Sequence, residues 1–150
     1  MSLEIEFLDK TETAFPEEMV RKVLAKTFTE AGVKMEGGVW EVSVTLVGEK
    51  EMAELNGQWL GKDFPTDVLS FAQTENPQQA REASGQGGRV FLGEIILCPA
   101  YIEKSAPLQQ KSWEWEMAYM ISHGLLHLLG YEHGEEMFLV QERVADSLSR

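Results

Sequence analysis

All three histidines of this 150-residue chain lie in the segment Ser122–His133, which reads SHGLLHLLGYEH. His123 and His127 are four residues apart, so on a helix they project from one face, a turn apart. Gly130 offers the left-handed conformation that ends a helix, after which the chain can fold back and bring His133 to the same point. Three neutral imidazoles with a fourth position open to water are typical of a catalytic site for one Zn²⁺ ion.

Three other interpretations of the histidine cluster are weaker. A histidine on an apolar helix face is often a core residue, but three histidines on one helix and its exit turn favour metal ligands. A structural zinc site usually has four ligands, often cysteines, and the single cysteine, Cys98, lies well before the cluster. The pattern HGxxHxxGxxH shares its spacing with the metzincin proteases, but these place a glutamate directly after the first histidine as general base. Gly124 occupies that position here, so a zinc peptidase is the least favoured function.

A zinc ion at this cluster would supply hydrolytic chemistry. It lowers the pKa of a bound water toward about 7 and stabilises a developing oxyanion, which suits phosphodiesters as well as amides. The neighbouring Glu132 is a candidate catalytic carboxylate that either orients a histidine or transfers protons, and both roles stay open. Asp67 is expected to fix a turn through backbone hydrogen bonds rather than to take part in catalysis.

The composition indicates one globular domain over residues 1–150. Apolar residues make up 43% of the chain and charged residues 25%, which is ordinary for such a domain. One cysteine excludes an internal disulfide framework and fits a reducing compartment. The N-terminal residues lack a signal-peptide pattern, and no segment approaches the roughly 20 apolar residues of a membrane helix. We therefore expect a cytoplasmic protein with no membrane partner.

The net charge of −12 constrains any function that involves RNA. Nucleic-acid binders usually have a basic balance or a basic patch. RNA contact would therefore come from a local basic rim formed by Lys62, Arg81 and Arg89 beside the metal, with a protein partner delivering the RNA.

The order of the expected elements predicts the fold class. Apolar alternation and β-branched residues predict strands at residues 3–8, 39–47, 68–71 and 90–97. Capping signals and apolar stripes predict helices at residues 16–31, 49–56, 99–110, 112–129 and 135–149. The polar, glycine-rich segment 74–88 predicts a mobile loop. Strands early and helices late indicate an α+β domain, with a small mixed sheet of about four strands packed with helices and the metal site at His123–His133.

Several blocks of this sequence resemble one family. SHGLLHLLGYEH resembles the signature of the YbeY family of zinc-dependent endoribonucleases. The blocks Leu55–Asn56, PTDVLSF from Pro65 to Phe71, and LGEI from Leu92 to Ile95 resemble further family blocks in the same order. The resemblance therefore extends from about Val39 to the C-terminus.

The resemblance implies an α+β fold and zinc held by His123, His127 and His133. It also implies cleavage of single-strand-type RNA, maturation of the 3′ end of small-subunit ribosomal RNA, and a part in ribosome quality control. The implied partners are ribosomal RNA and the small ribosomal subunit with its assembly factors, with no DNA. The nucleophile is either water or the RNA 2′-hydroxyl, and the sequence leaves both open.

Two positions depart from the family pattern. Glu132 stands where the family usually has aspartate, and Leu60 stands where it usually has arginine. A guanidinium binds phosphate bidentately and offsets its charge, whereas leucine does neither. Lys62 is the candidate catalytic substitute, and Lys62 and Arg89 are the candidate substrate-binding residues, although Lys62 is alternatively a solvated loop lysine. The alternative function is a zinc-binding ribosome-assembly factor with weak or no nuclease activity.

Overall fold

The computed structural model of the chain describes residues 2–13, 15–33, 38–62, 66–73 and 89–148. Its strands are β1 (Ser2–Asp9), β2 (Val39–Leu46), β3 (Val68–Ala72) and β4 (Arg89–Leu97). Its helices are α1 (Glu17–Glu30), α2 (Glu49–Leu60), α4 (Pro99–Ser105), the 3-10 helix η1 (Ala106–Gln109), α5 (Trp113–Leu128) and α6 (Glu135–Leu148).

The strands form one four-stranded sheet in the order β1-β2-β4-β3. β2 pairs in parallel with both β1 and β4, whereas β3 pairs antiparallel with β4. The sheet is therefore mixed, and the expected α+β class with a small mixed sheet is confirmed.

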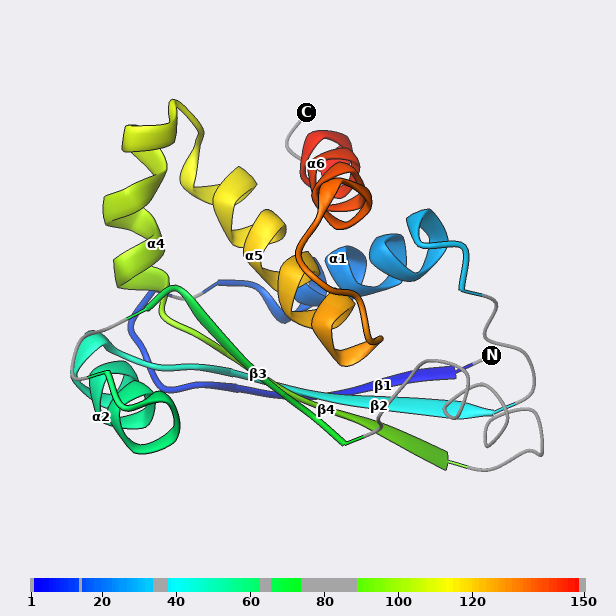
Figure 1. Cartoon of the computed structure of the whole chain (residues 1–150), viewed down its shortest axis with the longest axis horizontal. Helices are drawn as coiled ribbons and strands as arrows, with labels where there is room; N and C mark the ends of the chain where they lie inside the picture. The colour runs from blue at the N-terminus through cyan, green and yellow to red at the C-terminus, as the bar shows by residue number, and fades with distance from the viewer. Residues whose placement is uncertain (1, 14, 34–37, 63–65, 74–88, 149–150) are drawn as a thin grey trace.

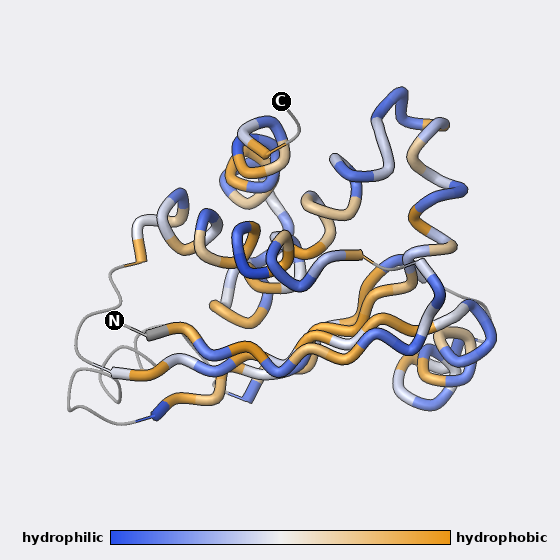
Figure 2. Tube along the Cα trace, turned by 180° about the vertical axis from the view of Figure 1, so that it is seen from behind, coloured by the Kyte–Doolittle hydropathy of each residue, from blue (hydrophilic) through white to orange (hydrophobic). Residues whose placement is uncertain are grey.

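The helices divide between the two faces of the sheet. α1, α5 and α6 lie over one face, and α2 lies on the other face near the end of β2 (Figure 1). β2 alternates buried and half-buried residues, and its buried side chains Trp40, Val42, Val44 and Leu46 join the core beneath the helices. A smaller cluster around Met52, Leu69 and Ile96 packs α2 against the sheet. Figure 2 shows hydrophobic residues concentrated along the sheet between these layers.

Two glycines allow α5 to lie directly on the sheet. A Cβ atom added at Gly124 would lie 2.7 Å from Ile95 Cγ2, so this turn of α5 touches β4 without a side chain between them. Gly93 has φ 144°, and a Cβ there would collide with the carbonyl oxygen of Phe71 on β3 and with Leu128 on α5. β3, β4 and the C-terminal half of α5 therefore meet closely.

Two helix ends have the capping that their residues favour. The Ser112 side chain caps α5 by accepting a hydrogen bond from the backbone N–H of Trp115 at 3.1 Å. Gly32, just past α1, has φ 70°, the left-handed conformation expected after a helix.

The predicted end of α2 at residue 56 was wrong, because the helix continues through Gly57 to Leu60. A glycine inside a helix costs only about 1 kcal/mol relative to alanine, and the burial of Met52 and Asn56 offsets that cost. The helix ends instead at Gly61, which has φ 71° and donates its N–H to the carbonyl of Gly57 at 3.1 Å.

The predicted helix at residues 99–110 is α-helical only as far as Ser105 and continues as the 3-10 helix η1. Pro107 lacks the backbone N–H that a further α-helical turn would use. The expected strand at residues 90–97 is confirmed, with Arg89 added at its start. The predicted loop at residues 74–88 lies outside the described residues. No helix in the described part of the chain is long and apolar enough to cross a bilayer.

Candidate metal centre

The three histidines converge through their Nε2 atoms. His123 and His127 project from the last turns of α5, and His133 follows the turn at Gly130, whose φ of 90° confirms the expected left-handed conformation. The Nε2 atom of His127 lies 3.1 Å from that of His123 and 3.0 Å from that of His133. The third separation, between His123 and His133, is 3.4 Å.

These separations fit a tetrahedral metal ion. Two nitrogen ligands about 2.0 to 2.1 Å from Zn²⁺ at tetrahedral angles lie about 3.3 Å apart. A donor set of three imidazoles suits zinc and similar transition ions and does not suit Mg²⁺ or Ca²⁺, which prefer oxygen. His123 and His127 are half-buried and His133 is exposed, so the triad faces solvent on one side. The residues therefore fit one zinc ion with a position open to a substrate.

Hydrogen bonds to the Nδ1 atoms orient the first two rings. His127 Nδ1 lies 3.2 Å from the backbone carbonyl of Tyr131. A carbonyl only accepts, so Nδ1 carries the proton and the Nε2 lone pair points at the other two rings. His123 Nδ1 lies 3.2 Å from Oε1 of Gln141, a buried residue of α6. Lone pairs facing one another at these distances repel unless a cation lies between them.

Burial also keeps the two α5 histidines in the metal-binding form. Desolvation lowers the pKa of His123, and the neighbouring histidines lower it further, against the opposing effects of Gln141 and Asp67. Desolvation and then His133 lower the pKa of His127, against the Tyr131 carbonyl. Both imidazoles are therefore neutral at neutral pH, the state in which they bind a metal.

Asp67 lies where the sequence placed it, at the turn into β3. Its Oδ1 accepts hydrogen bonds from the backbone N–H of Val68 at 2.8 Å and from the Thr66 hydroxyl at 3.3 Å. These bonds agree with the expected structural role. The carboxylate also raises the pKa of His123, so it lies within electrostatic range of the histidine triad.

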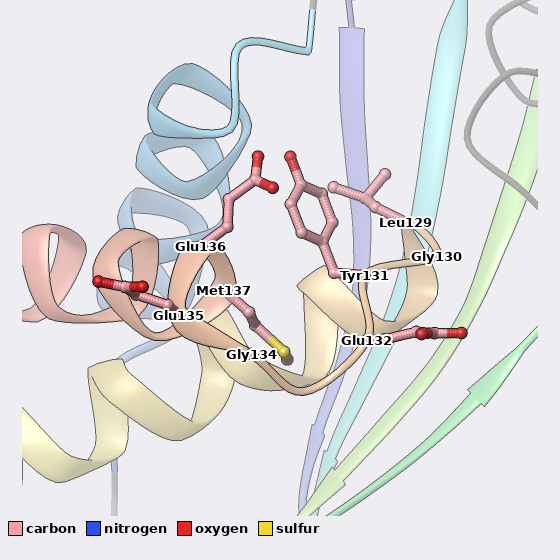
Figure 3. A pocket seen from close by; sticks show the side chains of 8 residues that line it. All are labelled: Leu129, Gly130, Tyr131, Glu132, Gly134, Glu135, Glu136 and Met137. Atoms are coloured by element: carbon pink, nitrogen blue, oxygen red, sulfur yellow. The ribbon is translucent and has the colours of Figure 1, made fainter.

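Glu132 lies on the exposed loop between α5 and α6. It lines a hollow with Leu129, Gly130, Tyr131, Gly134, Glu135, Glu136 and Met137. Figure 3 shows the Glu132 side chain extending away from those of Tyr131 and Glu136. The hollow carries three carboxylates, so it would repel phosphate, and an RNA strand would approach the histidines from another side.

The basic side chains that were predicted to contact RNA lie in different surroundings. Lys62 is exposed just beyond α2, and no ion pair among the described residues engages its amine. Arg89, at the start of β4, donates to Glu4 Oε2 and Glu41 Oε1, both at 2.9 Å, so the structure binds it to two carboxylates and not to the histidines. Arg81 lies outside the described residues. Leu60 is 56% exposed in the last turn of α2.

Gln141, at the site, escaped the sequence prediction, and so did Glu116, a buried polar residue on the same helix as His123. Gln141 contacts His123 from a helix that begins beyond the motif, and no local spacing signals such a contact. Glu116 is 1% exposed, and neither of its carboxylate oxygens has a hydrogen-bond partner among the described residues. Its position seven residues before His123 was the available signal, because that spacing is two helical turns and places both residues on one face.

The fold and the triad together define a class: a small α+β domain with a three-histidine centre at the end of its core helix. The family model described as Endoribonuclease YbeY matches residues 4–148, and the chain belongs to this family. The family match thus extends the resemblance seen in the sequence almost to the N-terminus.

Individual relatives match over nearly the whole chain. Endoribonuclease YbeY of Halalkalibacterium halodurans is 35% identical, covering 96% of this chain and 94% of the relative. Endoribonuclease YbeY of Bacillus velezensis is 36% identical, with coverage of 97% and 96%. A solution structure of a Thermotoga maritima protein superposes with a TM-score of 0.63 at 31% identity, over 95% of this chain and 87% of that one.

Proposed function

We propose that this protein is a zinc-dependent endoribonuclease that cleaves single-strand-type RNA in ribosomal RNA processing. The observation that carries the proposal is the convergence of three Nε2 atoms within 3.4 Å of one another, in a chain whose relatives are named endoribonucleases. Within this proposal the protein is cytoplasmic and matures the 3′ end of small-subunit ribosomal RNA. Its partners are then that RNA and the small subunit with its assembly factors.

His123, His127 and His133 would hold the metal through Nε2. A bound zinc ion supplies a Lewis acid that polarises a phosphoryl oxygen and activates a nucleophile. Lys62 offers an exposed ammonium group with no ion pair among the described residues, and we assign it to a substrate phosphate. Arg89 would have to leave Glu4 and Glu41 to do the same. Glu132, exposed beside His133, is the carboxylate proposed to exchange protons with solvent during the reaction.

The test is cleavage of an RNA that contains the 3′ region of small-subunit ribosomal RNA, using zinc-replete protein. We expect discrete products from the wild type and none from His123→Ala, with activity lost to a chelator and restored by zinc. The product ends identify the nucleophile, because attack by the 2′-hydroxyl leaves a cyclic phosphate and attack by water does not. Cleavage by the wild type that never exceeds the His123→Ala background would overturn the proposal.

A second candidate function is a zinc-binding ribosome-assembly factor with little nuclease activity. The observation that favours it is the exposed Leu60 in the last turn of α2, where the family usually carries arginine. Leu60→Arg separates the two functions. A large gain in cleavage indicates a weakened nuclease, whereas wild-type cleavage that Leu60→Arg does not improve assigns the phosphate contact to Lys62. Absence of cleavage in both proteins, with ribosomal subunit binding retained, favours the assembly factor.

A further inference from the structure

Gln141 is a fully buried amide that joins α6 to α5 at two points. Its Oε1 lies 3.2 Å from Nδ1 of His123, and its Nε2 donates to the backbone carbonyl of Tyr119 at 3.3 Å. Its exposure is 0%. Both of its contacts belong to α5, and one of them is a member of the histidine triad.

The Tyr119 carbonyl decides which way the amide points. A backbone carbonyl only accepts hydrogen bonds, so the NH₂ group of Gln141 must face Tyr119. The reversed amide would place Oε1 against that carbonyl, leaving two buried acceptors opposed. The hydrogen-bonding groups on either side of the amide therefore fix its orientation.

The amide orientation in turn decides the protonation of His123. Because Oε1 accepts, the facing Nδ1 atom of His123 must donate and so carries the proton. A neutral imidazole with its proton on Nδ1 has its lone pair on Nε2. That lone pair points toward His127 and His133, whose Nε2 atoms lie 3.1 and 3.4 Å away.

We propose that Gln141 is a positioning residue of the metal centre, which holds the His123 ring in place and fixes the tautomer that can bind the ion. The chain of hydrogen bonds runs from the Tyr119 carbonyl through the Gln141 amide to Nδ1 of His123. The inference rests on the proposed metal-dependent function. Gln141 belongs to α6. The packing of this last helix against α5 therefore also helps to position the proposed metal site.

The experiment compares zinc affinity, measured by competition with a chromophoric chelator and without RNA, in wild type, Gln141→Leu and Gln141→Glu. Leucine cannot accept the proton of Nδ1, and loss of such a contact lowers metal affinity by about 10- to 100-fold. Glutamate can still accept it through one carboxylate oxygen while its other oxygen faces the Tyr119 carbonyl, so Gln141→Glu is expected to bind zinc at least tenfold more tightly than Gln141→Leu even where it is the less stable variant. A purely structural role predicts the reverse order, because glutamate buries a charge and leucine does not.

Thr27→Val is the matched control. Thr27 is buried and hydrogen-bonds Ser122 of α5 at 2.9 Å, so the valine removes a buried polar contact to the same helix without touching a ligand. It should leave zinc affinity unchanged even where it lowers stability. ¹⁵N NMR of the metal-free protein supplies a second readout, with the Nδ1-protonated form of His123 dominant in wild type and mixed in Gln141→Leu.

The outcomes distinguish this inference from the proposed function. If wild type binds zinc, His123→Ala does not, and Gln141→Leu matches wild type, the role of Gln141 is overturned and the metal centre stands. If wild type and His123→Ala bind zinc equally weakly, the metal-dependent function itself fails. A loss in Gln141→Leu together with retention in Gln141→Glu supports the inference.

Discussion

Gly124 of α5 lies so close to Ile95 of β4 that a Cβ atom at residue 124 would come within 2.7 Å of Ile95 Cγ2. The position directly after the first histidine therefore faces the sheet, while His123 and His127 face each other beyond it. A glutamate there would point into the core and not toward a metal-bound substrate. The packing thus adds a physical reason against the peptidase function that the sequence already disfavoured.

The close approach of Gly124 and Ile95 predicts a stability loss in Gly124→Ala. Inserting a methyl group into a packed core costs about 1 to 3 kcal/mol. Denaturant unfolding should show a loss of that size, although alanine is the better helix former. Gly48→Ala is the control, because nothing lies within 4 Å of a Cβ at residue 48. Equal stability of Gly124→Ala and wild type would contradict this close packing of α5 on β4.

Zinc should stabilise the wild type against urea through the three histidines. A ligand that binds only the folded state at 100 times its Kd adds about 2.7 kcal/mol to the free energy of unfolding. In His127→Ala we expect most of this gain to disappear, because His127 Nε2 is within 3.1 Å of both partners. Parallel melts with zinc and with chelator measure the gain. An undiminished gain in His127→Ala would place the zinc elsewhere.

The buried carboxyl of Glu116 should make the free energy of unfolding depend on pH. Burial, and next the nearby Asp67 carboxylate, raise the pKa of Glu116, and Lys111 opposes the shift. Burial, then Glu142 and then this Glu116 carboxyl raise the pKa of Tyr119. Because the folded pKa is raised, the stabilising contribution of the protonated form is complete below the unfolded pKa of about 4.3 and is lost as the pH rises through the folded pKa.

Glu116→Gln keeps the shape of the side chain and removes its ionisation. Its free energy of unfolding, relative to wild type, should rise with pH above the ordinary glutamate pKa and level off above the raised one. Urea titrations at a series of pH values measure this difference, with the exposed Glu114→Gln on the same helix as control. A glutamine variant that is less stable than wild type throughout neutral pH would show instead that Glu116 is charged and paired.

We expect Lys62 to contact a phosphate group of the bound RNA, and we expect Arg89 to make no such contact. Removing one phosphate-binding lysine weakens RNA affinity for all sequences and reduces the slope of log K against log salt by about 1. Lys62→Ala should show both effects in binding titrations at several salt concentrations. Lys50→Ala removes the same charge from the other end of α2 and should show neither.

Arg89→Ala provides the complementary measurement. Arg89 is ion-paired with the exposed Glu4 and the half-buried Glu41 at the protein surface, and such surface pairs contribute about 0 to 1 kcal/mol each. We expect a small stability change and little change in RNA affinity. A loss of affinity in Arg89→Ala equal to that in Lys62→Ala would restore the substrate role predicted from the sequence.

The sequence by itself predicted that the three histidines converge at one point, because this convergence depends on local geometry. A four-residue spacing places two rings on one face of a helix, and Gly130 permits the turn that returns the third. Strand alternation and capping residues likewise predicted the α+β sheet and most helix ends. The prediction that α2 ends at residue 56 was wrong, because the burial of Met52 and Asn56 outweighs the small free-energy cost of placing Gly57 inside a helix.

Only the tertiary structure decided what surrounds the histidines. Gln141 reaches His123 from α6, Ile95 closes the space at Gly124, and Glu4 and Glu41 engage Arg89 from strands far away in sequence. None of these contacts has a local periodicity, because each forms only when separate elements pack together. Helix geometry therefore brings the three histidines together, and the packing of α5 between the sheet and α6 sets their protonation, orientation and access.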